Sequence, residues 1–130
     1  MNSKNLQRIL VVDDEADIQV VVKMALEMVG GFVVEVCSSG QEALKKIVTF
    51  QPDLILLDVM LPGMDGPSIF KELKNIEEIP PPRVIFLTAK IQTQDVELYN
   101  QLGVLGVLEK PFNPLSISSA IASIWNKQYE

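Results

Sequence analysis

The sequence contains no histidine and only one cysteine among its 130 residues. Without histidine there can be no Ser-His-Asp or Cys-His nucleophile system, no His-ligated zinc and no phosphohistidine carrier. The single cysteine, Cys37, cannot form an internal disulfide, so nothing in the sequence indicates secretion. Any chemistry must therefore use carboxylates, hydroxyls and lysines.

The sequence also lacks a long apolar run and a block of basic residues. No run approaches the length of a membrane span, and the apolar part of the amino-terminal segment MNSKNLQRILVV is too short for a signal peptide. The formal net charge of -6 disfavours binding to nucleic acid or to an anionic membrane surface. We therefore predict a cytoplasmic protein whose partners tolerate an acidic surface.

The composition is otherwise that of a folded domain, with 48% hydrophobic and 22% charged residues. A chain of this length buries roughly two-thirds of the surface that its unfolded form exposes. It shows no internal linker, repeat or low-complexity tract. We expect one domain over residues 1–130.

Apolar runs of strand length alternate with segments of helical spacing. The runs cover residues 9–12, 32–36, 54–57, 84–87 and 104–108. An amphipathic first helix is predicted to end at Gly30 and Gly31. Its expected core face comprises Ile18, Val21, Val22, Ala25, Leu26 and Val29.

Four further helices are predicted around residues 43–48, 69–73, 92–101 and 117–125. Asn113 is the expected N-cap of the last one, with Pro114 at its first position. The segment 92–101 should be the most loosely packed, because its apolar side has only three members, Val96, Tyr99 and Leu102. Strands that alternate with helices through short connections predict an α/β domain, with a parallel sheet covered on both faces.

In such a sheet, ligands gather at the carboxyl ends of the strands. Asp13 and Asp14 follow the first run, and Asp58 ends the third. Neighbouring carboxylates raise one another's pKa values unless a cation neutralises them, and Mg²⁺ suits an oxygen-only ligand set. Lys110 adds a positive charge and Thr88 a hydroxyl. The combination predicts a site for a phosphoryl group.

The stretch PDLILLDVMLPGMDG, residues 52–66, places Asp58 at the tip of a buried strand, directly before a loop rich in glycine and proline. A nucleophilic carboxylate must be held in line with an incoming phosphorus atom while cations neutralise the charge on the phosphoryl oxygens. We therefore interpret Asp58 as a nucleophile that a rigid strand positions. The following loop would let a large donor approach.

These motifs together resemble the response-regulator receiver domain of two-component signalling. The resemblance rests on Asp13-Asp14, on Asp58 in its stretch, on Thr88 in FLTAK and on Lys110 in EKPF, and it spans about residues 7–125. It implies a doubly wound, flavodoxin-like (βα)5 domain with strand order 2-1-3-4-5. It also implies a signalling switch, which catalyses only its own phosphorylation and slow autodephosphorylation.

The resemblance implies a role for each matching residue. Asp58 would form an aspartyl phosphate, using a phosphohistidine of a sensor histidine kinase or histidine phosphotransfer protein as donor. The Mg²⁺ ion would be bound by Asp14, Asp58 and the backbone carbonyl of Met60, with Asp13 acting through a water. Lys110 would contact a phosphoryl oxygen, and the Thr88 hydroxyl would swing toward it. The peptide bond between Lys110 and Pro111 would be cis.

One position departs from the family pattern. Val107 stands where the family usually has tyrosine or phenylalanine, three residues before the lysine. Valine cannot make the large ring movement that normally follows the movement of threonine. The surface of the fourth helix, fifth strand and fifth helix, where a downstream protein or a second receiver would bind, is therefore expected to respond weakly or through helix shifts alone.

Other interpretations were open from the sequence. Asp13 and Asp14 alone fit equally well as first-turn acids of the first helix, favoured by its dipole. An aspartyl-phosphate phosphatase would carry Asp-x-Asp after its first strand, a spacing that this chain lacks. A receiver that works without phosphorylation would lack one of the five chemical residues, and none is missing. Because the chain ends at Glu130, no output domain is expected in it, whether it is a stand-alone receiver or part of a longer regulator or hybrid kinase.

Overall fold

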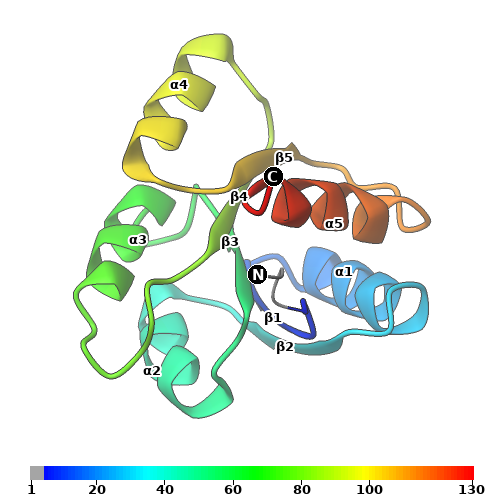
Figure 1. The fold of residues 1–130 in the computed structure, drawn as a ribbon, viewed down its shortest axis with the longest axis horizontal. Coiled ribbons are helices and arrows are strands. Elements are labelled where there is room, and N and C mark those ends of the chain that lie inside the picture. The colour runs from blue at the N-terminus through cyan, green and yellow to red at the C-terminus, as the bar shows by residue number, and fades with distance from the viewer. Residues whose placement is uncertain (1–4) are drawn as a thin grey trace.

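The computed structural model describes residues 5–130, which form a five-stranded parallel sheet in the order β2-β1-β3-β4-β5 (Figure 1). The predicted α/β fold and its strand order are confirmed. The strands are β1 (Arg8–Val12), β2 (Val33–Cys37), β3 (Leu54–Asp58), β4 (Val84–Thr88) and β5 (Gly106–Glu109). The helices are α1 (Ala16–Met28), α2 (Gly40–Phe50), α3 (Gly66–Lys74), α4 (Thr93–Leu102) and α5 (Ile117–Lys127). Within this part of the chain, no helix is long and apolar enough to cross a membrane.

Two apolar layers enclose the sheet. Helices α1 and α5 cover one face, and α2, α3 and α4 cover the other (Figure 1). Successive strand residues point to opposite faces, so Leu10 packs with the second group of helices and Ile9 with the first. Burial on both faces explains why the central strands β3 and β4 are apolar without alternation.

Side-chain caps fix the starts of two helices that lead away from the site edge. Ser39 accepts a hydrogen bond from the backbone N–H of Glu42 (3.2 Å) at the start of α2. Asp65 accepts one from the N–H of Ser68 (2.8 Å) at the start of α3. Each cap satisfies a donor that the first turn of a helix leaves unpaired.

Helix α4 is the most loosely attached helix, as the sequence predicted. None of its residues is fully buried. Its main anchor is Tyr99, whose ring lies edge-on against Phe86 of β4 with centroids 4.9 Å apart. Phe86 also contacts Phe70 of α3 edge-on at 6.2 Å, so one short aromatic chain links α3, the sheet and α4.

Two expectations about the helices are wrong. Val21 and Val29, assigned to the core face of α1, are 42% and 54% exposed, because only Val22, Ala25 and Leu26 of this helix reach the sheet closely enough to be buried. Helix α5 begins at Ile117 and not beside Asn113. The Asn113 side chain instead accepts a hydrogen bond from the N–H of Leu115 (2.9 Å), within a turn that precedes the helix.

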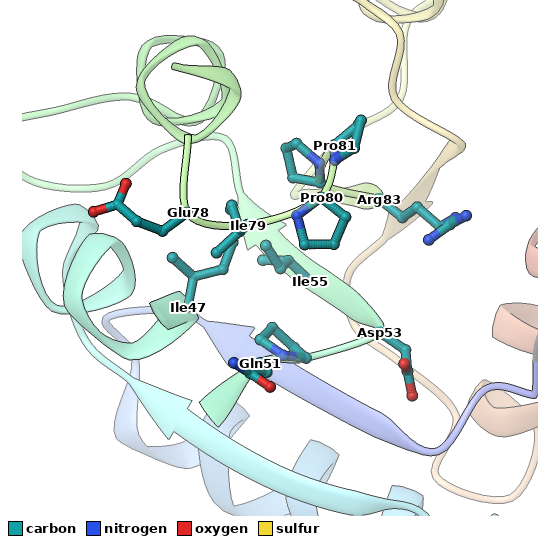
Figure 2. A pocket seen from close by; sticks show the side chains of 11 residues that line it. Ile47, Gln51, Asp53, Ile55, Glu78, Ile79, Pro80, Pro81 and Arg83 are labelled. Carbon is teal, nitrogen blue, oxygen red and sulfur yellow. The ribbon is translucent and has the colours of Figure 1, made fainter. Parts of the chain in front are cut away.

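A cavity of about 320 Å³ lies at the amino ends of the strands, opposite the edge where Asp58 ends β3. Ile47, Ile55 and Ile79 point toward one another within it, while Asp53 and Arg83 point away from them (Figure 2). Pro80, Pro81 and Pro82 form part of its wall. Isoleucine side chains thus meet inside the cavity, while Asp53 and Arg83 lie at its rim.

Candidate functional site

Strand register brings the predicted site residues to one edge of the sheet. Val12 pairs with Leu57, so the next residues along these strands, Asp13 and Asp58, leave the sheet side by side. The end of β4 is joined to the first residue after β5, because the N–H of Lys110 donates a hydrogen bond to the carbonyl of Thr88 (2.8 Å). The carboxyl ends of β1, β3, β4 and β5 therefore meet, as a parallel sheet requires.

Asp58 is held rigidly at this edge. It is only 4% exposed, and both of its carboxylate oxygens have donors. Oδ1 accepts a hydrogen bond from the backbone N–H of Met60 (3.0 Å), and Oδ2 accepts one from Lys110 Nζ (3.0 Å). Its orientation is thus fixed from the loop on one side and from the end of β5 on the other.

Lys110 is the cation of the cluster. Its Nζ lies 2.6 Å from Asp13 Oδ2, 3.0 Å from Asp58 Oδ2 and 3.1 Å from Glu15 Oε1. Burial alone would lower the pKa of the Lys110 ammonium, but the contacts with Asp13, Asp58 and Glu15 outweigh burial and hold its pKa above the ordinary lysine value. Lys110 therefore stays charged. Its peptide bond to Pro111 is cis, as the resemblance implied.

Asp13 is the least solvated member of the cluster. It is fully buried, and burial raises its pKa even though Lys110 opposes the shift. Its Oδ1 accepts a hydrogen bond from the N–H of Glu15 (2.9 Å). Its Oδ2 is paired with the Lys110 ammonium at 2.6 Å and has no further donor among residues 5–130. Because Lys110 is shared among three carboxylates, the cluster has an excess of negative charge that a further cation would neutralise.

The three aspartates fit a hard cation. Carboxylate oxygens of Asp13, Asp14 and Asp58 all lie within 4.8 Å of one another, and Asp14 is exposed to solvent. Oxygen ligands with one side open to water suit Mg²⁺, which keeps several waters when it binds to proteins. The observation that favours a cation here is the excess of carboxylates, since one lysine faces Asp13, Asp58 and Glu15, and Asp14 lies beside them.

The Thr88 hydroxyl, at the end of β4, is hydrogen-bonded to Lys90 and to no carboxylate among residues 5–130. It donates to the carbonyl of Lys90 (3.2 Å) and accepts from the Lys90 N–H (3.3 Å), so it closes a local turn after β4. Val107 lies opposite Phe86 across the β4–β5 pair and is half-buried against the same apolar layer as Tyr99. The sequence predicted where these residues would lie, and their roles stay predictions.

Three residues near the site carried no role in the sequence analysis. Glu15 contacts Lys110, which is 95 positions away, and the pairing could not be read from either segment alone. Gln19 donates from its side chain to the carbonyl of Asp13 and to Ser38 Oγ (3.0 Å), and so supports the acidic loop from α1. Gly66 packs on the backbone of β3: a Cβ atom there would lie 2.8 Å from Val59 Cα and 2.9 Å from the Asp58 carbonyl oxygen.

Comparison with known proteins identifies the family. Residues 9–122 match the response regulator receiver domain. The chain belongs to this family. One relative is the alkaline phosphatase synthesis transcriptional regulatory protein PhoP of Bacillus subtilis. It is 41% identical over 118 residues, which are 91% of this chain and 48% of that protein. The DNA-binding response regulator MtrA of Mycobacterium tuberculosis is 37% identical over 115 residues, 88% of this chain and 49% of that protein.

Solved receiver structures share the fold. Chemotaxis response regulator CheY4 of Vibrio cholerae superposes with a TM-score of 0.83 at 28% identity, covering 92% of this chain and 99% of that one. A receiver domain protein of Clostridium thermocellum gives 0.79 at 31% identity, covering 95% and 98%. The chain thus spans about half the length of the curated relatives and nearly all of a single receiver. Its function is that of a phosphoaccepting signalling domain, in a family of signalling switches.

Proposed function

We propose that Asp58 is the phosphoacceptor of this receiver and that its donor is a phosphohistidine on a sensor histidine kinase or a histidine phosphotransfer protein. The observation that carries the proposal is the fixed, buried carboxylate of Asp58, which accepts hydrogen bonds from the Met60 N–H and from Lys110 Nζ. One carboxylate is thereby held in place for a donor, beside a lysine that it shares with Asp13.

The chemistry follows from this arrangement. An Asp58 oxygen forms a bond to phosphorus while the phosphorus–nitrogen bond of the donor breaks, and the bonding electron pair leaves with the imidazole. Lys110 Nζ, 3.0 Å from Asp58 Oδ2, needs only a short movement to hold a phosphoryl oxygen. The Thr88 hydroxyl would have to release the Lys90 carbonyl to do the same. Such donors stabilise charge on the transferring group.

The proposed ligands of Mg²⁺ are Asp14, Asp58 and the Met60 carbonyl, with Asp13 acting through a water. When bound, the ion would neutralise phosphoryl oxygens and the acidic cluster. Asp58 is 4% exposed, which limits the access of water to an aspartyl phosphate. We therefore propose that the only reactions this domain catalyses are its own phosphorylation and a slow dephosphorylation.

The proposed output surface is formed by α4, β5 and α5, where a downstream protein or a second receiver would dock. Thr88 and Val107 are its proposed switch positions. Because α4 has no fully buried residue, it can shift at small cost when the loop after β4 moves. The net charge of -6 supports a domain that does not itself bind nucleic acid, although relatives of about twice its length are named as DNA-binding. One domain over residues 1–130 and a cytoplasmic location complete the proposal.

The test is intact-protein mass spectrometry after incubation with acetyl phosphate, with and without Mg²⁺. We expect a Mg²⁺-dependent gain of one phosphoryl group in the wild type and none in Asp58→Asn. Asp17→Asn is the control, because it removes the same negative charge from an exposed position in the first turn of α1. It should be labelled as the wild type is. Persistent labelling of Asp58→Asn would remove Asp58 from this role.

A further inference from the structure

Lys110 has one partner that belongs neither to the proposed metal ligands nor to the proposed acceptor. This is Glu15, whose Oε1 lies 3.1 Å from Lys110 Nζ. The Glu15 side chain is 60% exposed, whereas that of Lys110 is 11% exposed. Glu15 therefore contacts the ammonium from the solvent side, while Asp13 and Asp58 contact it from inside the protein.

The backbone position of Glu15 makes this contact unusual. Glu15 is the N-cap residue of α1, yet its side chain makes no capping hydrogen bond. N-cap positions favour short side chains that accept from the first turn, and losing such a cap costs helix stability. Here the side chain lies at Lys110 instead. The Glu15 N–H meanwhile donates to Asp13 Oδ1 (2.9 Å), so one residue touches both Asp13 and Lys110.

The negative charge of a phosphoryl group on Asp58 would affect the contact between Glu15 and Lys110. A phosphoryl group on Asp58 would bring a charge of about -1.5 to -2 beside Lys110. The ammonium has three hydrogens and already faces three carboxylates. Glu15 is the partner with the most freedom to leave, because it is the exposed one. If it stayed, Glu15, Asp13 and the phosphoryl group would share one ammonium at close range.

We propose that Glu15 is a positioning residue that holds Lys110 in the unphosphorylated state and competes with the phosphoryl group for its ammonium. The competition disfavours the phosphorylated state and so lowers its occupancy at a given donor concentration. This inference rests on the proposed function of Asp58. Glu15 is thereby expected to weaken the binding of a phosphoryl group at this site and to strengthen the binding of Mg²⁺.

The test measures the two affinities separately in Glu15→Gln, which keeps the shape of the side chain and removes its charge. Beryllofluoride, a mimic of the phosphoryl group, is titrated at fixed, saturating Mg²⁺ by calorimetry. Mg²⁺ is titrated alone in a second experiment. We expect beryllofluoride to bind about two- to fivefold more tightly to Glu15→Gln, the range for losing an exposed charge contact. Mg²⁺ alone should bind slightly more weakly, because one nearby negative charge is gone; unchanged Mg²⁺ affinity would refute the expected effect on cation binding.

Asp17→Asn is the matched control. It makes the same change in net charge in the first turn of α1, with no contact to Lys110 among the interactions of residues 5–130. It should leave beryllofluoride affinity within the error of the wild type. Added salt should reduce the gain in Glu15→Gln, because the Glu15 side chain is solvent-exposed.

The possible failures are distinguishable. If the wild type binds beryllofluoride and Glu15→Gln binds it no more tightly, or if Asp17→Asn shows the same gain, the role of Glu15 is refuted and the proposed function stands. If the wild type does not bind beryllofluoride, or if Asp58→Asn binds it equally well, the proposed function fails, and the inference about Glu15 fails with it.

Discussion

The two ends of the sheet handle charge in opposite ways. At the amino end, Asp53 accepts hydrogen bonds from the backbone N–H groups of Gln7 (3.0 Å) and Arg8 (2.9 Å), and Arg8 lies over the Phe50 ring at 4.2 Å. Asp53 thereby ties the start of β1 to the segment before β3, at the rim of the cavity (Figure 2). At the carboxyl end, Asp13 and Asp58 share one lysine, and Asp13 Oδ2 has no donor besides it among residues 5–130.

The difference indicates which end is built for stability and which for chemistry. Charges that satisfy backbone groups stabilise the fold whatever is bound. Buried carboxylates that face one another are costly until a cation or a reacting group joins them. A site that takes up Mg²⁺ and a phosphoryl group, as proposed for Asp58 and its neighbours, cannot have all of its charges paired before they bind. Free energies of unfolding measured with and without Mg²⁺ distinguish the two ends.

The largest effect is expected for Lys110→Met. It removes the ammonium from Asp13 and Asp58, which are almost fully buried, and uncompensated buried charge costs about 3 kcal/mol. Urea unfolding should show this loss without Mg²⁺ and a partial recovery with it. Lys45→Met, an exposed change of the same kind on α2, should show neither. An unchanged free energy of unfolding in Lys110→Met would mean that the cluster does not depend on its lysine.

A smaller effect is expected for Gly66→Ala. The new methyl group would meet the backbone of Val59 and Asp58, which cannot move aside as a side chain could, and overpacking of this kind costs about 1–3 kcal/mol. Because the strained atoms include those of Asp58, acetyl phosphate labelling should also slow. Gly106→Ala is the control, since there the nearest atoms to the methyl group belong to the Ile124 side chain, which can move aside. Equal labelling rates in Gly66→Ala and the wild type would contradict this account.

At the amino end, Asp53→Ala should cost about 1–2 kcal/mol, because the N–H groups of Gln7 and Arg8 lose their acceptor. The loss should be the same with and without Mg²⁺, and phosphorylation should proceed as in the wild type. This is the reverse of the pattern expected for Lys110→Met. A Mg²⁺-dependent loss in Asp53→Ala would show that the two ends are coupled and would break the contrast.

The sequence predicts those features of the site that depend only on where each strand ends. Apolar runs locate the strands to within about two residues, and parallel pairing then brings Asp13, Asp14 and Asp58 to one edge. The cluster with Lys110 follows from the same logic. Each strand is marked by a local run of apolar residues and its end by a polar residue, which is why a pattern of residue types is enough to predict these features.

The features that the sequence could not predict depend on distances between segments. Gly66 resembles a turn residue in the sequence, yet its lack of a side chain matters because the Asp58 backbone lies against it. The Thr88 hydroxyl can reach several groups, and only the geometry of the loop selects Lys90. Val21 fits a helical stripe, but the helix presents a narrower face to the sheet than the stripe suggested. Contacts of this kind require coordinates.

The smallest effect concerns Cys37, which lies at the same end of the sheet as Asp58 but in the apolar layer. Its side chain is 2% exposed, and burial, helped by the charge of Glu42, raises the pKa of its thiol to about 12. Since the thiolate is the reactive form, about one thiol in ten thousand is ionised at pH 8 in the folded protein, against about one in ten with the ordinary pKa of 9.0.

We therefore expect iodoacetamide to modify Cys37 slowly in the native protein and rapidly in urea, as followed by intact mass. Mg²⁺ should not change the native rate, because Cys37 contacts the acidic cluster only through its backbone carbonyl, which accepts from the Asp13 N–H (3.1 Å). Rapid native modification would mean that water reaches the end of β2. The solvent-accessible region around the site would then extend past Asp13 and Asp58 into the apolar layer that contains Cys37.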